Sequence, residues 1–279
     1  MLELQSVDFG YKAQTKAISN VSLVINSGEF LAIAGRNGSG KTTLTRLLMA
    51  LKKPTAGEIL LQGQSIKKLS PADMARHIGY VFQNPDRQIF RDTVQAEVSY
   101  GPEQLGYSPE HIQKYVCDAL AVTGLTELAA SYPSTLSRGQ KQRLAIASAL
   151  AMQPAMLILD EPTSGQDAQE CQQLLTLLAK LHQQGKTIVL ITHDMELLAC
   201  YAERVIVMEH GCKVFDGSPS ALFQEDSLTQ WGLSAPVAYK ISRALASMGI
   251  EQTCTIQPLI IQLNQLSRRD AHAKARSIN

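Results

Sequence analysis

Polar and apolar residues alternate at the start of the chain, with the two-residue period of a strand that buries one face. In the first predicted strand, residues 2–9, the candidate buried positions are Leu2, Leu4, Val7 and Phe9, and their spacing requires a bulge. Short runs rich in apolar residues predict further strands at 18–25, 29–34, 57–62 and 78–82. The first part of the chain is therefore expected to be rich in β-structure.

From about residue 88 to residue 150 the period becomes that of a helix, and strand patterns are absent. Ser108-Pro109 marks one helix start, because Ser is a good N-cap and Pro fits the first helical position. Strand patterns return, separated by helical segments, at 155–159, 187–191, 205–208 and 213–215. Strands that alternate with helices predict an α/β fold with a parallel sheet, here interrupted by a helical insertion.

The pattern is helical again in the last part of the chain. Pro236 is expected to begin a helix that Gly249 ends, with one apolar stripe formed by Val237, Ile241 and Leu245. Residues 258–266 predict a second short helix. About 45 residues are too few to fold alone, so we expect a large α/β unit over 1–232 and a dependent module over 233–279.

Composition narrows the class of protein. With 279 residues, 45% of them hydrophobic and 18% charged, the chain is expected to be globular. A net charge of +1 gives no case for a nucleic-acid partner. The five cysteines form no C-x-x-C pair, which is typical of a reducing compartment. The longest apolar run is broken at Gln153-Pro154, so work at a membrane would need a partner protein.

Residues 35–42, Gly-Arg-Asn-Gly-Ser-Gly-Lys-Thr, lie between a predicted strand and a predicted helix. Glycines at this spacing let successive backbone N–H groups point at one anion, and the helix dipole adds to the attraction. Lys41 can reach the β- and γ-phosphates, and the Thr42 hydroxyl can bind Mg²⁺. The pattern favours a phosphate-binding P-loop over a simple Gly-rich turn, so a bound nucleoside triphosphate is expected. Its expected contacts are Gly35, Arg36, Asn37, Gly38, Ser39, Gly40, Lys41, Thr42 and Thr43.

The apolar strand 156–159 ends in two carboxylates, Asp160 and Glu161. A strand buried on both faces delivers such residues to the ligand crevice of an α/β sheet. Asp160 suits the Mg²⁺ shell of the nucleotide, and Glu161 can orient the attacking water or accept its proton. The alternative is an acidic pair that stabilises a helix start before Pro162. The P-loop elsewhere in the chain favours the catalytic interpretation.

Three single residues are weaker candidates. Gln83 follows a predicted strand and could reach a metal or water, although a lone loop Gln is usually solvated. His193 follows the strand 187–191 at the same sheet edge, where imidazole can contact a γ-phosphate; a structural role is the alternative. Tyr11 could stack on an adenine ring or simply pack against its neighbours.

The segment 136–140, Leu-Ser-Arg-Gly-Gln, precedes a helix expected over 141–152. Ser137 and Gly139 at a helix N-terminus can form an anion site, although a Ser there is often an ordinary N-cap.

This ordered set of motifs resembles the ATP-binding-cassette (ABC) ATPase family over roughly residues 1–230. The matching motifs are Tyr11 (A-loop), Gly35–Thr42 (Walker A), Gln83 (Q-loop), Leu136–Gln140 (signature), Met156–Glu161 (Walker B), Ser164–Asp167 (D-loop) and His193 (switch). Arg138 stands where the common signature has Gly, and Gln166 where the D-loop usually has Leu. Because the other motif residues are present, the resemblance implies a catalytically competent subunit.

Within the family, residues 81–106 look like the ATPase subunits of energy-coupling factor (ECF) transporters, which drive vitamin or metal-ion uptake in prokaryotes. The C-terminal module fits them in architecture, since their short helical extension helps to hold a dimer. The resemblance implies a RecA-like parallel core with an antiparallel N-terminal β part, a helical insertion over about 88–150, and a peripheral position on the cytoplasmic face of the cell membrane.

The resemblance also implies a head-to-tail pair with a second ATPase subunit, either identical or related. ATP and Mg²⁺ would lie between Walker A of one subunit and Ser137, Arg138, Gly139 and Gln140 of the other, near Asp167 of the D-loop. Thr42, Gln83 and Asp160 would hold the metal, and Glu161, His193 and Gln83 would act in hydrolysis. The membrane partners implied are a transmembrane scaffold (T) protein and a substrate-binding (S) protein.

Asp92 and Glu97 are expected to edge an apolar groove that receives an arginine-bearing scaffold helix, or else to be solvated residues at a helix start. Conventional ABC importers or exporters share every core motif and remain an alternative. Soluble ABC proteins of DNA repair or translation are less favoured, because the chain has one cassette and no long coiled coil. A P-loop kinase or GTPase would lack the signature. The transported solute stays open.

Overall fold

A six-stranded sheet forms the centre of the computed structural model, which describes residues 1–12 and 15–276. Its strands lie in the order β10-β9-β3-β8-β7-β6. Their bounds are Phe30–Ala34 (β3), Ile78–Val81 (β6), Met156–Asp160 (β7), Thr187–Ile191 (β8), Arg204–Glu209 (β9) and Cys212–Gly217 (β10). The neighbours from β9 to β6 are parallel, as the alternation of strands and helices predicts.

The last strand, β10, departs from the expected parallel sheet because it runs antiparallel to β9. The two strands are joined by His210-Gly211, and both residues have positive φ, 46° and 80°. Two such residues form a type I′ turn, which joins antiparallel strands, whereas a parallel pair needs a long crossover. The short turn therefore sets the direction of β10.

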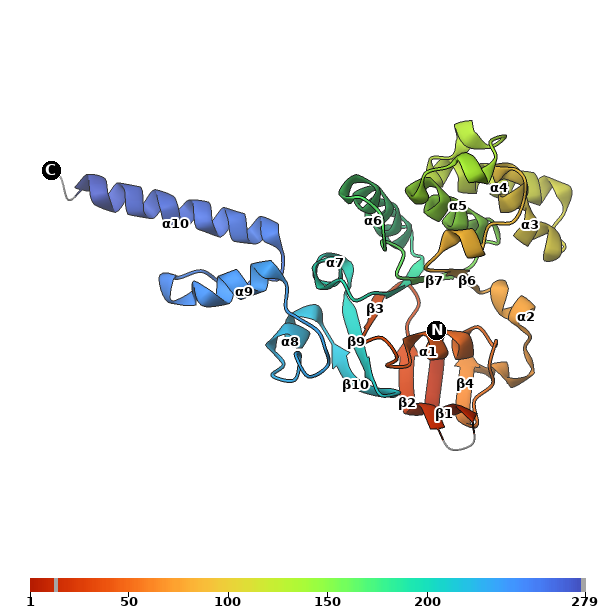
Figure 1. Ribbon diagram of the computed structural model, residues 1–279, viewed down its shortest axis with the longest axis horizontal. Helices are drawn as coiled ribbons and strands as arrows, with labels where there is room; N and C mark the ends of the chain where they lie inside the picture. Colours follow the sequence, from red (N-terminus) through yellow and green to blue (C-terminus); the bar gives the residue numbers. More distant parts are fainter. Residues whose placement is uncertain (13–14, 277–279) are drawn as a thin grey trace.

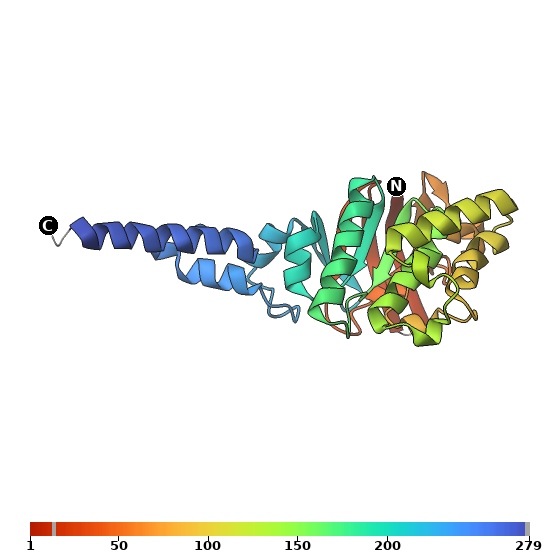
Figure 2. The same cartoon turned by 90° about the horizontal axis from the view of Figure 1, so that it is seen from above.

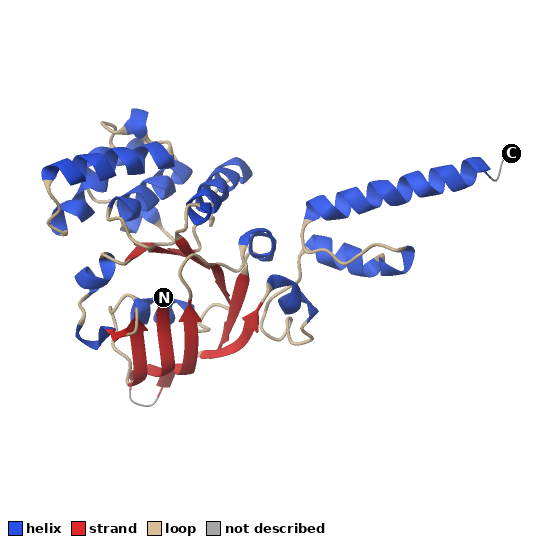
Figure 3. Ribbon diagram, turned by 180° about the vertical axis from the view of Figure 1, so that it is seen from behind, coloured by secondary structure: helices blue, strands red, loops and turns tan. Residues whose placement is uncertain are grey.

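The second sheet is antiparallel and has the order β2-β1-β4-β5 (Figure 3). Its strands are Leu2–Lys12 (β1), Thr15–Ile25 (β2), Ala56–Leu61 (β4) and Gln64–Ser65 (β5). All the predicted buried positions of β1 are buried, namely Leu2, Leu4, Val7 and Phe9. The bulge that their spacing requires is confirmed, since the register of β1 against β2 shifts between Leu4 and Val7.

Helix α1, Lys41–Leu48, lies between the two sheets (Figure 1). Its buried leucines belong to one apolar core with residues of both sheets; they are Leu44, Leu47 and Leu48. The segment before α1 is thereby fixed at the carboxyl end of β3, which is where an α/β sheet binds its ligands.

Helices cover the opposite face of the central sheet. The predicted helical stretch contains α3 (Val94–Gln104), α4 (Pro109–Thr123) and α5 (Arg138–Ala151), and short α2 (Pro71–Ala75) precedes them. Helices α3, α4 and α5 share a core with the sheet and with α6 (Ala168–Gln183), whereas Met74 of α2 belongs to the core around α1. Ser108 caps α4 as predicted, because its Oγ accepts from the N–H of His111 at 3.4 Å. Helices α7 (Met195–Tyr201) and α8 (Pro219–Gln224) pack around β9 in a third core.

Two helices project from the rest of the molecule at its C-terminal end (Figure 2). They are α9, Val237–Ala244, and α10, Ile256–Arg276. The predicted second helix was too short. Pro258 sits in the first turn of α10, where its missing N–H is not needed, and Ala, Lys and Arg continue the helix after the apolar pattern ends. Residues 277–279 of the predicted module lie outside the described residues.

Two of the three residues of the predicted stripe are uncovered, since Val237 and Ile241 are 56% and 38% exposed. The third, Leu245, is partly buried against a small core formed by residues of the C-terminal helices themselves. The helix instead buries Ala238, Tyr239 and Ser242. Its start is tied to the cassette because Glu196 of α7 accepts from the N–H of Val237 at 2.7 Å. The stripe is thus free of the cassette core. Nowhere in the described chain is a helix both long and apolar enough to cross a membrane.

Candidate nucleotide site

The segment between β3 and α1 has the tight backbone that its glycines predict. Gly35 and Gly40 have φ values of 139° and 107°. A Cβ at Gly35 would collide with the carbonyl oxygen of Met208, and one at Gly40 would lie 2.9 Å from the carbonyl oxygen of Ala17. Only glycine fits both the φ values and these close approaches.

Lys41 begins α1 and points back into this loop. Its Nζ donates to the carbonyl oxygens of Gly35 at 2.6 Å and Arg36 at 3.0 Å. Burial lowers the pKa of Lys41, while the nearby carboxylates of Glu161 and Asp160 oppose that shift. The positive charge of Lys41 is balanced only in part by these carboxylates, so the ammonium is suited to bind phosphate.

A cavity of about 610 Å³ opens beside the loop. It is lined by many of the predicted residues, namely Asn37, Gly38, Gly40, Lys41, Thr42, Thr43, Gln83, Asp160 and Glu161. Ser39, also predicted, is 5% exposed, and its Oγ has no hydrogen-bond partner among the described residues. The structure thus brings most of the predicted P-loop and carboxylate residues to one cavity.

Glu161 joins the other two predicted catalytic residues. Its Oε2 accepts from Nε2 of Gln83 at 2.8 Å, and its Oε1 lies 3.0 Å from Nδ1 of His193. Because an ionised carboxylate only accepts, Nδ1 of His193 is the donor. Glu161 has an unusual φ of 44°, and its backbone N–H donates to the carbonyl oxygen of Ile191 on β8. The residue is thereby held between the ends of neighbouring strands.

Asp160 is positioned by a residue that sequence reasoning missed. The Tyr80 hydroxyl donates to its Oδ2 at 3.1 Å, and burial together with Asp160 raises the pKa of that hydroxyl. Burial likewise raises the pKa of Asp160, with the hydrogen bond from Tyr80 opposing. Tyr80 lies on β6, which pairs with β7, so a polar aromatic near the end of a predicted neighbouring strand was the available signal.

The donor set fits a hard divalent cation. The Thr42 hydroxyl, the Asp160 carboxylate and the Gln83 amide all line the same cavity, and Mg²⁺ prefers such oxygen ligands.

Tyr11 stands next to the start of α1. Its hydroxyl lies 3.3 Å from Oγ1 of Thr43 and accepts from Arg46 at 3.0 Å. These hydrogen bonds lower the pKa of Tyr11, and the one with Thr43 has the larger effect. The ring is half exposed and meets Phe9 edge to face, and Nζ of Lys52 lies over it at 5.8 Å from the centroid. A planar ligand that stacked on that face would have to displace Lys52.

The segment 136–140 lies elsewhere, since none of its residues lines the cavity among those described. Helix α5 begins at Arg138, three residues earlier than expected. The reason is a capping box, in which Ser137 Oγ accepts from the N–H of Gln140 at 3.2 Å and Gln140 Oε1 accepts from the N–H of Ser137 at 2.8 Å. Gly139 and Gln140 therefore belong to the first helical turn.

The same segment contacts the start of α6. Ser137 Oγ donates to Oε1 of Glu170 at 2.7 Å, and a Cβ at Gly139 would lie 2.5 Å from Cδ of Glu170. Asp167 caps α6 by accepting from the N–H of Glu170 at 2.8 Å. The Arg138 guanidinium lies over Gly165. A Cβ added to Gly165 would be 2.7 Å from Cζ of Arg138.

The sequence profile of the ABC transporter family matches residues 18–164, more than half of the chain. The chain belongs to the ABC transporter family. An energy-coupling factor transporter ATP-binding protein, EcfA2 of Streptococcus pyogenes, is 39% identical over 275 residues, covering 95% of this chain and 97% of that protein. A putative ABC transporter ATP-binding protein of Methanosarcina mazei is 45% identical over 85% of this chain, which spans only 40% of that protein's length.

Solved structures agree with this ABC cassette. The cbiO1 protein of Clostridium perfringens, part of the ABC transporter complex cbiONQ, superposes with a TM-score of 0.76 at 33% identity, covering 89% of this chain and 96% of that one. The ATP-binding cassette MJ0796, solved as a dimer with ADP and Pi, gives a TM-score of 0.70 at 32% identity, covering 78% of this chain and 99% of that one. The expected ABC fold is therefore confirmed.

The cassette also has a groove between the loop before α3 and residues 132–134, and here the structure corrects an expectation. Glu97 is 3% exposed, and its Oε2 accepts from the N–H groups of Phe90 and Arg91 at 2.9 Å each. It therefore fixes the loop before α3 and is neither an acidic groove edge nor a solvated residue. Asp92 is exposed and lines a groove of about 300 Å³. Ile89 and Phe90 line the groove, whereas the neighbouring apolar residues Val94 and Val98 are buried in the core.

Arg36 of Walker A makes one further contact. Its side chain lies on Gly232, where a Cβ would collide with its Nε. This contact joins the P-loop to the segment that leads into α9.

Proposed function

We propose that the chain hydrolyses ATP as the energy-supplying subunit of an ECF-type importer for a vitamin or a metal ion. The observation that carries the proposal is the convergence of Gln83 and His193 on Glu161, beside the cavity that Lys41 and Asp160 line. A P-loop that only bound nucleotide would not need a carboxylate whose two oxygens are oriented by residues from separate strand ends.

Each residue has a role that follows from its position. Backbone N–H groups of the P-loop and the Lys41 ammonium bind the phosphates. Thr42, Asp160 and Gln83 hold Mg²⁺, which neutralises phosphate charge when bound. Glu161 orients the attacking water and accepts its proton, and His193 contacts the γ-phosphate when its ring turns from Glu161. Tyr11 stacks on the adenine.

Glu161→Gln tests the hydrolytic role. The amide keeps the size of the side chain but cannot accept a proton, so steady-state ATPase activity should fall by at least about 100-fold, the order of a lost general base, while ATP still binds. Glu110→Gln, the same change at an exposed glutamate of α4 that lines neither the cavity nor the groove, is the matched control and should hydrolyse ATP at the wild-type rate. A Glu161→Gln variant with near wild-type turnover would contradict the proposal.

A second ATPase subunit completes the site in this proposal. Ser137 and Gly139 lie away from the chain's own cavity, with their helix N-terminus at the surface, which suits them to the nucleotide of a head-to-tail partner. The dimeric MJ0796 cassette supports such a pair. Each half-site alone leaves the γ-phosphate partly unsatisfied, so ATP favours the closed pair by its differential affinity.

The EcfA2 relative and the cbiO1 structure support ECF-type membrane partners. We assign the groove at Asp92 to a helix of a transmembrane scaffold protein, which in turn holds a substrate-binding protein. This places the subunit at the cytoplasmic face of the membrane. Asp92→Lys should retain nucleotide binding but lower co-purification with the membrane proteins. Recovery of the complex at wild-type yield, with normal uptake, would remove the groove from this role.

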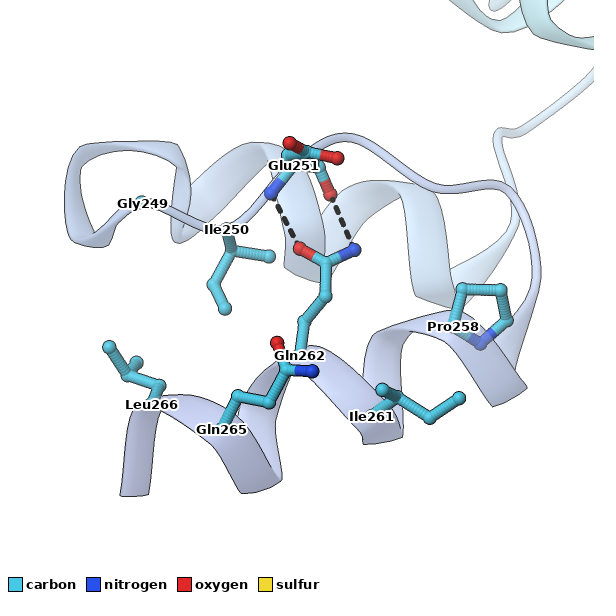
Figure 4. Close-up of a pocket in the computed structure, with 8 residues that line it drawn as sticks. All are labelled: Gly249, Ile250, Glu251, Pro258, Ile261, Gln262, Gln265 and Leu266. Carbon is cyan, nitrogen blue, oxygen red and sulfur yellow. Dashed lines mark hydrogen bonds between the residues drawn. The ribbon is translucent and has the colours of Figure 1, made fainter. Parts of the chain in front are cut away.

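The C-terminal module, residues 233–279, is proposed to hold the pair together between ATP cycles. It has its own small core of Ala238, Ile250 and Leu259. Gln262 ties α10 to the preceding segment by accepting from the N–H of Glu251 at 2.6 Å and donating to its carbonyl oxygen at 3.3 Å (Figure 4). Its exposed apolar residues, which are Val237, Ile241, Met248, Ile256, Ile260 and Ile261, support an interface.

A further inference from the structure

Glu170 engages both signature residues that the proposed function assigns to the partner's γ-phosphate. Its Oε1 accepts from Ser137 Oγ at 2.7 Å, and its carboxyl group lies against Gly139, as the 2.5 Å approach of an added Cβ to Cδ indicates. Glu170 is held in place from its own side, because its backbone N–H donates to Asp167. One carboxylate thus lies at the place where a phosphate is expected.

The hydrogen-bond capacity of Ser137 makes this contact consequential. A serine hydroxyl has one proton to donate. In this structure the proton goes to Glu170, while the oxygen accepts from the N–H of Gln140. The hydroxyl cannot donate to a phosphate oxygen until it releases the carboxylate, and a negative charge beside the site also opposes a triphosphate.

We infer that Glu170 is a positioning residue that acts through Ser137, holding the signature hydroxyl in a resting state from which the partner's ATP must displace it. The inference rests on the trans role of the signature proposed above. Its consequence is a higher ATP concentration for closure of the pair, without a change in how the chain's own P-loop binds nucleotide.

The test uses the full chain with the second ATPase subunit with which it is purified, in a Glu161→Gln background so that ATP is not consumed. Closure of the pair is followed by energy transfer between one dye on each subunit as ATP is titrated, because the two subunits stay paired without nucleotide and only their separation changes. Glu170→Ala should lower the half-saturating ATP concentration roughly three- to ten-fold, in line with a lost hydrogen bond to a partly exposed charge. Glu170→Gln, which keeps an acceptor but not the charge, should fall between.

Two comparisons separate this role from a structural one. Gln169→Ala changes an exposed neighbour on the same helix turn and should leave the titration unchanged. Nucleotide affinity of the chain by itself should be the same in Glu170→Ala as in the parent, because Glu170 does not line the chain's own nucleotide cavity. A Glu170→Ala variant that needs the same or more ATP for closure overturns the inference, because the contact would then only support α5.

A double-mutant cycle tests the route through the hydroxyl. In a Ser137→Ala background, Glu170→Ala should lower the ATP requirement by less than half as much, on a logarithmic scale, as in the parent. An equal effect in both backgrounds would mean a general charge effect and would refute the role assigned to Ser137. If Ser137→Ala alone leaves closure unaffected, the trans role of the signature itself fails, and the inference fails with it.

Discussion

Burial of the Asp160 carboxylate lowers the stability of the folded protein. Its pKa is raised, chiefly by burial, so the ionised form is less favourable in the folded protein than in the unfolded chain. Such strain is expected where a negative charge is kept for a ligand rather than for the fold.

Asp160→Asn should therefore raise the thermal midpoint of the nucleotide-free protein at neutral pH while it lowers ATPase activity. A group whose pKa is higher in the folded protein than in the unfolded chain stabilises the fold at low pH, and this stability is lost as the pH rises through the folded-state pKa. The stability advantage of Asn over Asp160 should therefore shrink as the pH falls and Asp160 becomes neutral. Thermal melts of both proteins from pH 7 to pH 4 measure this difference. An advantage that grows on acidification would contradict the sign argued here.

Lys41 gives a second prediction at this scale. Lys41→Ala removes the phosphate-facing ammonium, and ATP affinity in a direct titration should fall by at least about ten-fold, the value of one charged hydrogen bond. Lys53→Ala, at an exposed lysine after α1, is the matched control. An unchanged affinity in Lys41→Ala would show that the ammonium serves only the loop carbonyls.

At the scale of elements, the loop that enters α3 depends on one buried carboxylate. Glu97→Ala would leave the N–H groups of Phe90 and Arg91 without their acceptor, and the free energy of unfolding should fall by about 2 kcal/mol. Glu97→Gln keeps an oxygen in the same place and should cost less. Denaturant unfolding provides the measurement, with the exposed Asp92→Ala as a control that should be close to wild type. A Glu97→Ala variant as stable as that control would show that Glu97 does not stabilise the loop before α3.

Most elements could be predicted from the sequence because their signals are local. Alternation gave the buried face of β1, and Ser108-Pro109 gave the start of α4. The ends that were misplaced depend on other forces. The start of α5 follows from a reciprocal cap between Ser137 and Gln140, and α10 outlasts its apolar pattern because helix propensity alone extends it.

The same division holds for the site. The P-loop, Asp160 and Glu161 could be predicted, since strand ends and glycine spacing place them. The contacts of Tyr80 with Asp160 and of Glu170 with Ser137 join residues 80 and 33 positions apart. Only the paired strands and the packing of α6 on α5 bring these residues together, and no local pattern encodes that proximity. Glu97 was misassigned because a pattern of charges does not reveal that its side chain accepts hydrogen bonds from backbone N–H groups.

On the scale of the whole molecule, the projecting C-terminal helices carry several large apolar residues that are exposed, among them Val237, Ile241 and Ile256. Truncation after Gly232 should lower the fraction of paired subunits in the absence of nucleotide, since the exposed stripe has no place on the cassette. Light scattering of the truncated and full chains checks this. An exposed-surface change that leaves the module in place, Glu225→Gln, serves as the control. The same paired fraction after truncation would restrict the module to a local role.

The link between the nucleotide site and these helices is short and is held by two contacts. Gly232 lies under the side chain of Arg36, and five residues later the N–H of Val237 is held by Glu196 of α7, the helix that begins just after His193. Arg36 thus contacts the chain at the start of the link, and Glu196 anchors its end to α7. Because the start of α9 is hydrogen-bonded to α7, a change in the tilt of α7 would reach the projecting helices through this single contact.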